Sequence, residues 1–228
     1  MARCTKEEAL ETRSRILDAA EDVFHAKGVS QTTLNDVAEA AGVTRGAIYW
    51  HFKNKSDLFD GMFARVHLPM DAMVQSSASE TEPDPLGQLR AICIFIFQET
   101  VRNPRSRKVL DIVFHRCEWV DAAGPLAARQ RACFEQATAN IERILANAVR
   151  RSQLPPDLDT RLAAVTLHAM IDGLLNNWLF CPGGFALDTE AERLVDACLD
   201  TLRHAVSLRH GPHASRNQAS GNKSCKTS

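Results

Sequence analysis

The segment from residue 34 to residue 52 limits the fold more than any other part of the chain. It contains two short apolar patterns of helical period, separated by Gly42. Glycine suits this position because a tight turn requires a positive φ angle that other residues rarely adopt. Ala38 is small enough for two helices to cross closely beside it. The segment therefore predicts two short helices around a tight turn. Its inner apolar side chains are Val37, Ala41, Val43 and Ile48.

Helix signals continue on both sides of this segment. An apolar stripe of helical period covers residues 16–24, and Gly28 then suits the end of a helix. Residues 33–36 have the Thr-x-x-acid spacing of a capping box, in which side chains satisfy free backbone N–H groups. Thr44 suits the cap of the next short helix, at about 44–50. A third start signal, Asn-Lys-Ser-Asp, opens a long helix that we expect over about 54–75.

The rest of the chain also has helical patterns. The polar stretch 76–85 is typical of a loop, and Pro85 suits the first turn of the following helix. That helix contains AICIFIF, a run with strand propensity whose length and flanks favour a buried helix. We expect further helices at about 105–119, 125–152, 158–180 and 187–207. The sequence therefore predicts an all-α fold of about nine helices.

Composition excludes several classes of protein. The formal net charge is −1, so contacts with nucleic acid would depend on a few well-placed charges. The seven cysteines are odd in number and scattered, which indicates reduced thiols and not a disulfide framework. The first residues lack an apolar signal core, and AICIFIF is far too short to span a membrane. We therefore expect a cytoplasmic protein with no membrane partner.

The two short helices have the spacing of a helix-turn-helix motif, which places its second helix in the major groove of DNA. Arg45 has the guanidinium fork that reads guanine edges, and Gly46 is small enough for close backbone approach. Hydroxyl and lysine side chains at helix N-termini suit phosphate. A simple packing unit with polar surface residues is the alternative. The predicted DNA contacts are Thr44, Arg45, Gly46, Ala47, Tyr49, His51 and Lys55.

The chain resembles the TetR family of bacterial transcriptional regulators, and within it the AcrR-like repressors of multidrug efflux pumps. The resemblance is carried by TKEEALETRSRILDAAEDVFHAKGVSQTTLNDVAEAAGVTRGAIYWHFKNKSDLF, by HRCEW and by DGLLNNWLF. It covers about residues 1–208. The resemblance implies DNA contacts by Thr33, Thr44, Arg45, Ala47, Tyr49, His51 and Lys55.

The same resemblance implies further features. Lys6, with Arg3, would lie on a flexible arm that enters the minor groove, and Trp50 and Phe52 would face inward. The chain would form a homodimer through about 158–180 and 187–207. Its two motifs would then lie about one DNA turn apart, which implies a palindromic operator.

These observations predict a division into two domains and a tail. Residues 1–54 would form the helix-turn-helix DNA-binding domain, with the two-helix motif at about 33–52. Residues 55–208 would form a ligand-binding and dimerisation domain. Residues 209–228 are polar and lack an apolar stripe, which predicts a disordered tail.

The resemblance implies a pocket for a small molecule among the middle helices. The candidate lining is broad, apolar and sulfur-rich, which suits an adaptable site, although apolar residues at helical spacing are usually core. Four polar candidates would need partners on an apolar face: His67, Gln130, Asp172 and Asn177. The apolar and sulfur candidates are Phe63, Val66, Met70, Leu89, Cys93, Ile96, Phe97, Leu110, Phe114, Cys117, Phe134, Ile141, Met170 and Leu174.

The predicted function is a DNA-binding repressor, of a multidrug efflux operon, that small hydrophobic or amphipathic ligands release from its operator. The alternative is a TetR-family repressor or activator of a metabolic operon, responding to a lipid or aromatic metabolite. No catalytic motif indicates an enzyme, and no cofactor is expected. His115 and Cys117 point about 200° apart on a helix, so they do not suggest a metal site.

Overall fold

The computed structural model describes residues 6–117 and 124–210, apart from the side chains of residues 67–71 and 125. Within this part the chain forms nine α-helices and one short 3-10 helix, so the predicted all-α class and helix number are confirmed. The helices are α1 (Lys6–Lys27), α2 (Leu34–Ala40), α3 (Arg45–His51), α4 (Lys55–Ser77), α5 (Pro85–Arg102), α6 (Pro104–His115), α7 (Pro125–Arg150), α8 (Thr160–Phe180) and α9 (Ala191–His204), followed by η1 (Val206–Leu208). None of the described helices is long and apolar enough to cross a membrane.

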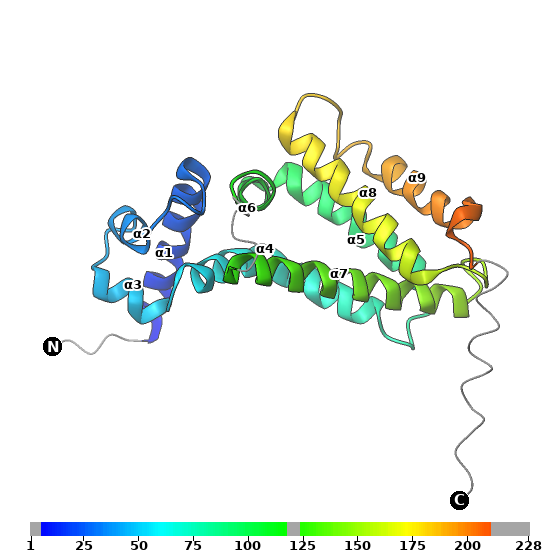
Figure 1. Ribbon diagram of the computed structural model, residues 1–228, viewed down its shortest axis with the longest axis horizontal. Helices are drawn as coiled ribbons and strands as arrows, with labels where there is room; N and C mark the ends of the chain where they lie inside the picture. The colour runs from blue at the N-terminus through cyan, green and yellow to red at the C-terminus, as the bar shows by residue number, and fades with distance from the viewer. Residues whose placement is uncertain (1–5, 118–123, 211–228) are drawn as a thin grey trace, which may run out of the picture.

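The molecule has two parts (Figure 1). We call α1, α2 and α3 the head, and α4 to α9 the body. The head lies at one end, and α9 lies toward the opposite end of the body. The long helix α4 leads out of the head into the body, and α6 lies between α1 and the end of α8. A change in the tilt of α4 or α6 would therefore move the head relative to the body.

One apolar core holds the head together, and it extends into the body. α1, α2 and α3 contribute its centre, including Phe24 and Ile48, which are both 0% exposed. The first turns of α4 and one face of α6 complete it. The predicted boundary after residue 54 thus separates segments that share a core. The contributions from α4 and α6 are Leu58, Phe59, Met62, Val109, Ile112 and Val113.

A second core fills the body between α5, α7, α8 and α9. It includes Phe97 and Leu167, each 0% exposed. The apolar run AICIFIF lies in α5, as a helix and not a strand, so the sequence interpretation of that run is confirmed. The last long helix, predicted to start at about residue 187, is α9, and it begins later, at Ala191.

Local signals determine where the head helices begin and turn. Thr33 forms the predicted capping box with Asp36, and Thr44 and Asn54 cap α3 and α4. Gly42 has φ +62°, the positive angle predicted for the turn between α2 and α3. Because these caps satisfy backbone N–H groups at helix starts, they set the angle at which α3 leaves the turn.

The predicted tail begins later than the sequence indicates. Arg209 forms a backbone bridge with Leu158, and the backbone N–H of His210 donates to the carbonyl of Asp157 at 2.9 Å. These two residues are therefore part of the fold, because the loop before α8 offers them hydrogen-bond partners. The remainder of the predicted tail, residues 211–228, lies outside the described residues.

Candidate nucleic-acid interface

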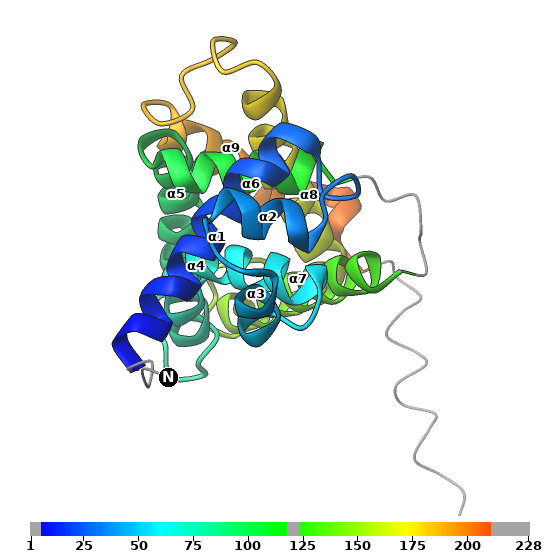
Figure 2. The ribbon, with the colours of Figure 1, turned by 90° about the vertical axis from the view of Figure 1, so that its left-hand side faces the viewer.

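α3 presents its outer face at the free end of the head. On its inner side, Ile48 and Phe52 are 0% and 1% exposed and belong to the core of the head. Arg45 and Tyr49 lie on the outer side and are exposed. Figure 2 views the molecule from the head end and shows α3 at the front, next to α2. The arrangement leaves one side of a short helix open for a DNA groove.

Thr44 has two uses at the start of α3. Its Oγ1 accepts a hydrogen bond from the backbone N–H of Ala47 at 3.1 Å, which caps the helix. A hydroxyl group has one O–H donor in addition to its lone pairs. The cap uses a lone pair, so it leaves the hydroxyl proton of Thr44 for a phosphate oxygen.

Arg45 and Tyr49 support each other across one helical turn. The Arg45 Cζ lies 5.8 Å from the centre of the Tyr49 ring, within the range of a cation–π contact. Tyr49 is 47% exposed, so its hydroxyl and ring edge remain accessible. The contact holds the guanidinium along the outer face of α3, which lowers the cost of ordering it on DNA.

Trp50 corrects one expectation. The sequence resemblance implies that Trp50 faces inward, but its side chain is 73% exposed. The reason is geometric, since Ile48 and Phe52 occupy the single inner face of α3 and Trp50 lies two residues from each. Phe52 does face inward, as expected. Trp50 therefore adds a large apolar ring to the exposed surface of α3.

His51 is held at the edge of this surface. Its ring packs edge-on against the Trp50 ring, with 4.5 Å between ring centres. Partial burial and the nearby Arg13 guanidinium lower the pKa of His51. A neutral imidazole can share a hydrogen bond with DNA but brings no positive charge to a phosphate.

Lys55 is used inside the head. Its Nζ donates to the backbone carbonyls of Val29, Ser30 and Thr32 at 2.7, 2.9 and 3.0 Å. An ammonium group has three N–H donors, and all three are occupied. Burial lowers the pKa of Lys55. The phosphate contact predicted for Lys55 is not available in this conformation, because the side chain ties the start of α4 to the loop after α1.

Thr33 is also occupied within the head. Its hydroxyl donates to Asp36 Oδ2 at 2.6 Å, while its Oγ1 accepts from the backbone N–H of Asp36. The hydrogen bonds from Thr33, followed by one from Lys27, hold the pKa of Asp36 well below its usual range. Thr33 would have to leave this capping box to donate to a phosphate, so the DNA contact predicted for it competes with the cap.

The remaining predicted DNA contacts differ in position. Gly46 is exposed and Ala47 is half-buried, so both small residues lie where α3 faces outward. Lys6 is exposed, but it is the first residue of α1 and not part of an arm. Arg3, the other residue of the predicted arm, lies outside the described residues. Lys6 can therefore approach DNA from a fixed helix end.

Apart from the exposed Phe134, the apolar ligand candidates with described side chains fall into two groups in the body. Leu89, Cys93 and Phe97 are at most 5% exposed and belong to the tight second core, so they leave little room for a ligand. Burial raises the pKa of the Cys93 thiol to about 12, which keeps it protonated. The half-buried apolar candidates are Phe63, Val66, Ile96, Leu110, Phe114, Cys117, Ile141, Met170 and Leu174.

Apart from Cys117, which follows α6, the half-buried group comes from α4, α5, α6, α7 and α8. It packs against the cores without being sealed by them. Gln130 on α7 is also half-buried. The side chains of His67 and Met70 lie outside the described part of the structure, so these two predictions stay predictions. Because the group is apolar and incompletely covered, it suits a ligand whose shape completes the packing.

A polar cluster on α7 and α8 adds two residues that sequence analysis missed. The ring of His168 stacks on Phe134 with 4.9 Å between centres, and its Nδ1 lies 2.9 Å from the Thr138 hydroxyl. His168 Nε2 lies 3.5 Å from Asp172 Oδ2. Burial raises the pKa of Asp172, and His168 opposes that shift. The four-residue spacing of His168 and Asp172 was the available signal for the pair.

Two neighbouring asparagines on α8 face different surroundings, and the ligand contact predicted for Asn177 stays a prediction. Asn177 is exposed, whereas the neighbouring Asn176 places its Oδ1 3.2 Å from His115 Nε2 on α6. A helix turns by about 100° per residue, so one position decides which asparagine faces α6. Among the described residues, one cavity beside α6 and another beside the loop before α8 share no residue with the predicted ligand set.

Two family models match the chain. Residues 16–62 match the model of bacterial regulatory proteins of the tetR family, and residues 84–204 match the C-terminal region of the MAATS-type transcriptional repressors. The chain belongs to the TetR family. The resemblance proposed from the sequence is therefore confirmed, and the exposed α3 lies within residues 16–62, which match the N-terminal model of the family.

Named relatives extend this assignment. The transcriptional regulator TtgR of Pseudomonas putida is 44% identical, over 92% of this chain and 100% of its own length. The structure of NalD, named as the secondary repressor of the MexAB-OprM multidrug efflux pump in Pseudomonas aeruginosa, has a TM-score of 0.74 at 38% identity, covering 86% of this chain and 98% of NalD. A SmeT–triclosan complex has a TM-score of 0.77 at 35% identity, covering 88% and 96% of the two chains.

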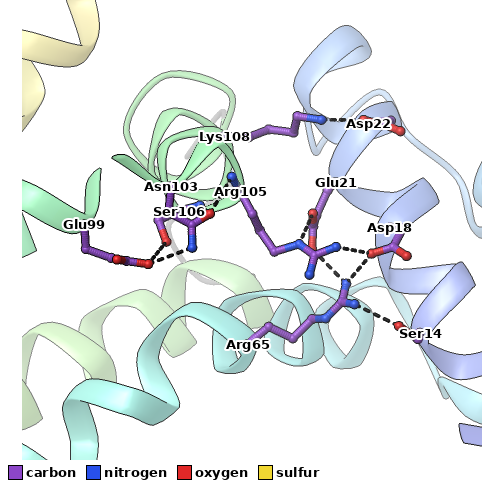
Figure 3. Close-up of polar contacts among 10 residues, drawn as sticks. All are labelled: Ser14, Asp18, Glu21, Asp22, Arg65, Glu99, Asn103, Arg105, Ser106 and Lys108. Atoms are coloured by element: carbon purple, nitrogen blue, oxygen red, sulfur yellow. Dashed lines mark hydrogen bonds and ion pairs between the residues drawn. The ribbon is translucent and has the colours of Figure 1, made fainter. Parts of the chain in front are cut away.

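A charged junction joins the head of this TetR-family chain to its body (Figure 3). Arg65 on α4 contacts Asp18 and Glu21 on α1 at 2.8 and 2.9 Å. Arg105 on α6 contacts the same two carboxylates at 2.5 and 3.1 Å. Lys108, also on α6, adds a contact with Asp22 at 2.6 Å. The head is thus held by charges from two body helices at once.

Glu21 is the buried centre of this junction. Its side chain is 5% exposed, and burial raises its pKa, although Arg105 and Arg65 oppose the shift. A buried carboxylate is costly without its partners. Any movement that separates α4 from α6 therefore disturbs the charge balance around Glu21, and with it the position of the head.

Proposed function

We propose that this protein is a homodimeric repressor of a multidrug efflux operon, released from a palindromic operator by a small hydrophobic or amphipathic ligand. The observation that carries the proposal is the exposed outer face of α3, with Arg45, Tyr49 and Trp50 held on a rigid head. The names of TtgR, NalD and SmeT support the regulatory target, since NalD is described as a repressor of a multidrug efflux pump.

The proposed dimer would pair α8 and α9 with the same helices of a second copy. α8 exposes apolar side chains that a single chain leaves uncovered: Leu162 is 44% exposed, Val165 is 37% exposed and Phe180 is 82% exposed. Burying such a face in a symmetric interface supports the four-helix arrangement. The two copies of α3 would then reach half-sites roughly 34–36 Å apart, one turn of DNA.

The proposed ligand would bind against the half-buried apolar side chains of the body. Phe114 on α6 and Met170 on α8 belong to that group. A ligand that binds better when α4 or α6 tilts would shift the protein toward that conformation by its differential affinity. The charged junction then carries the shift to α1, because Arg65 and Arg105 share carboxylates on that helix.

A footprint on the DNA flanking its own gene tests this proposal. We expect full-length protein to protect one palindromic segment, and triclosan, the compound named in the SmeT complex, to abolish protection. Protection that is absent from every flanking sequence would contradict the repressor assignment. Protection that triclosan and other apolar drugs leave intact, but that a lipid or aromatic metabolite removes, would favour the metabolic regulator instead.

A further inference from the structure

A cavity lies where the head meets the body. It has a volume of about 360 Å³ and opens between the end of α1, α6 and the turn after α8. Figure 1 shows α6 between α1 and the end of α8 at this place. Small-molecule sites typically measure about 300–1,000 Å³. The cavity shares no residue with the half-buried apolar group or with the outer face of α3.

The wall of this cavity is predominantly cationic. Arg107, Lys108 and Arg116 line it, against the single carboxylate of Asp111. Lys108 is paired with Asp22, and Arg116 Nε lies 3.4 Å from Asp111 Oδ2. The wall therefore keeps an excess of positive charge after these pairs are counted, which favours an anionic occupant.

Arg107 is the source of that excess. Its Cζ lies 5.1 Å from the centre of the buried Trp178 ring, and its Nη2 donates to the carbonyl of Val101 at 2.6 Å. Among the described residues no carboxylate lies within ion-pair distance of Arg107. The guanidinium is thus fixed in place by an aromatic ring and a backbone carbonyl, and its charge is not neutralised. A preorganised, unpaired guanidinium is a good anchor for a carboxylate.

The remaining wall is apolar. Pro104, Leu179 and Pro182 line it, and Leu179 is 8% exposed. A small inorganic ion would leave these side chains without a partner, whereas an apolar ring or chain would cover them. The cavity therefore combines an anchor for an anion with a surface for an apolar group.

We propose that this cavity is a second ligand site, which takes a small apolar carboxylate. The carboxylate binds Arg107 and Arg116, and its apolar part packs on Pro104, Leu179 and Pro182. This site is separate from the drug site proposed above. It is built from α6 and its neighbours, and the proposal stands whether or not the apolar interior of the body binds drugs.

The position of the cavity connects it to the head. His25 Nε2 on α1 lies 3.2 Å from Asp111 Oδ2, and Lys108 contacts Asp22 on α1 at 2.6 Å. A carboxylate held by Arg107 and Arg116 also attracts the neighbouring Lys108 and so competes with Asp22 for it. It therefore weakens contacts between α1 and α6 and loosens the head. This consequence rests on the proposed DNA-binding function, whereas binding of the carboxylate does not.

The test uses 2-naphthoate as the probe and the neutral 2-naphthamide as its matched control, titrated calorimetrically into the full-length protein. We expect saturable binding of naphthoate and at least tenfold weaker binding of the amide. Arg107→Gln should weaken naphthoate by about tenfold, as expected for loss of one charge-assisted contact. Arg143→Gln is the matched arginine control, because Arg143 is an exposed residue of α7, outside the cavity and the proposed dimer helices, and its Nη2 donates to Asn140 one turn away.

Arg116→Gln provides a second variant, should loss of the contact with Trp178 disturb folding. Thermal unfolding of each variant checks that it is folded before titration. The proposal is overturned if naphthoate fails to bind, if acid and amide bind equally, or if both folded variants bind naphthoate as the unchanged protein does. A loss of operator affinity on adding naphthoate, absent in Arg107→Gln, would support the connection to the head.

Discussion

The head and the body are packed differently, although both are helical. In the head, Phe24, Ile48 and Phe52 are at most 1% exposed. Side-chain caps set the starts of α2 and α3. In the body, Phe114 and Leu174 lie half-buried beside a tight core. Close packing gives the head one geometry, which suits reading DNA. Incomplete packing would let the body change its shape around the proposed ligand.

The largest expected effect compares one phenylalanine from each part. Phe24→Ala removes a side chain that is 0% exposed, so the free energy of unfolding should fall by about 3–5 kcal/mol. Phe134→Ala removes a ring that is 46% exposed and stacked on His168, and should cost about 1 kcal/mol. Denaturant unfolding measures both. Equal losses would show that the head is no more tightly packed than this surface of the body.

The next effect concerns the outer face of the head. Arg45→Ala should weaken operator binding by roughly 10–100-fold, because a guanidinium that reads a guanine edge contributes about 1–3 kcal/mol. The variant should stay folded, since Arg45 is exposed. Fluorescence anisotropy with the footprinted operator measures the affinity, and Arg143→Ala on α7, outside the proposed dimer helices, serves as control. Operator binding that survives the loss of Arg45 would remove it from the reading role.

A smaller effect separates a structural lysine from a DNA-binding one. Lys55→Met removes three hydrogen bonds to backbone carbonyls and should lower the free energy of unfolding by about 1–2 kcal/mol. The folded variant should retain the salt dependence of operator binding. A lysine that contacts phosphate would instead lower the slope of log affinity against log salt by about one. Such a decrease would restore the role that the sequence predicts.

The smallest effect is expected at the junction between the two parts. Burial raises the pKa of Glu21 above its ordinary value of 4.5, so the folded protein holds that proton more tightly than the unfolded chain does. The tighter binding of this proton stabilises the folded protein fully below pH 4.5. The stabilisation is lost as the pH rises through the higher pKa of Glu21 in the folded state. The stability of the unchanged protein relative to Glu21→Gln should therefore decline toward neutral pH. A rise would mean that the arginines outweigh burial.

Short-range signals made the head predictable from sequence. The cap at Thr44, the turn at Gly42 and the helix start at Asn54 each depend on residues within a few positions, and all three are found in the structure. The apolar run in α5 was also assigned correctly, because its flanks contain helix signals. Local patterns therefore sufficed for the fold class and for the position of α3.

Contacts between distant residues were not predictable in the same way. Lys55 bonds carbonyls 23 to 26 positions earlier, and Arg105 meets Glu21 across 84 positions. Nothing local in the sequence marks such partners. Trp50 was placed wrongly for a related reason, since the inner face of a seven-residue helix is decided by what packs against it. A single inner face holds Ile48 and Phe52 and excludes Trp50.

Release of the operator by a ligand requires coupling between body and head, and a linkage cycle measures that coupling directly. Operator affinity is measured with and without saturating triclosan, and triclosan affinity is measured with and without operator. We predict that triclosan weakens operator binding and that the operator weakens triclosan binding by the same factor, because coupling free energy is reciprocal. Saturation with triclosan that leaves operator affinity unchanged would contradict the account.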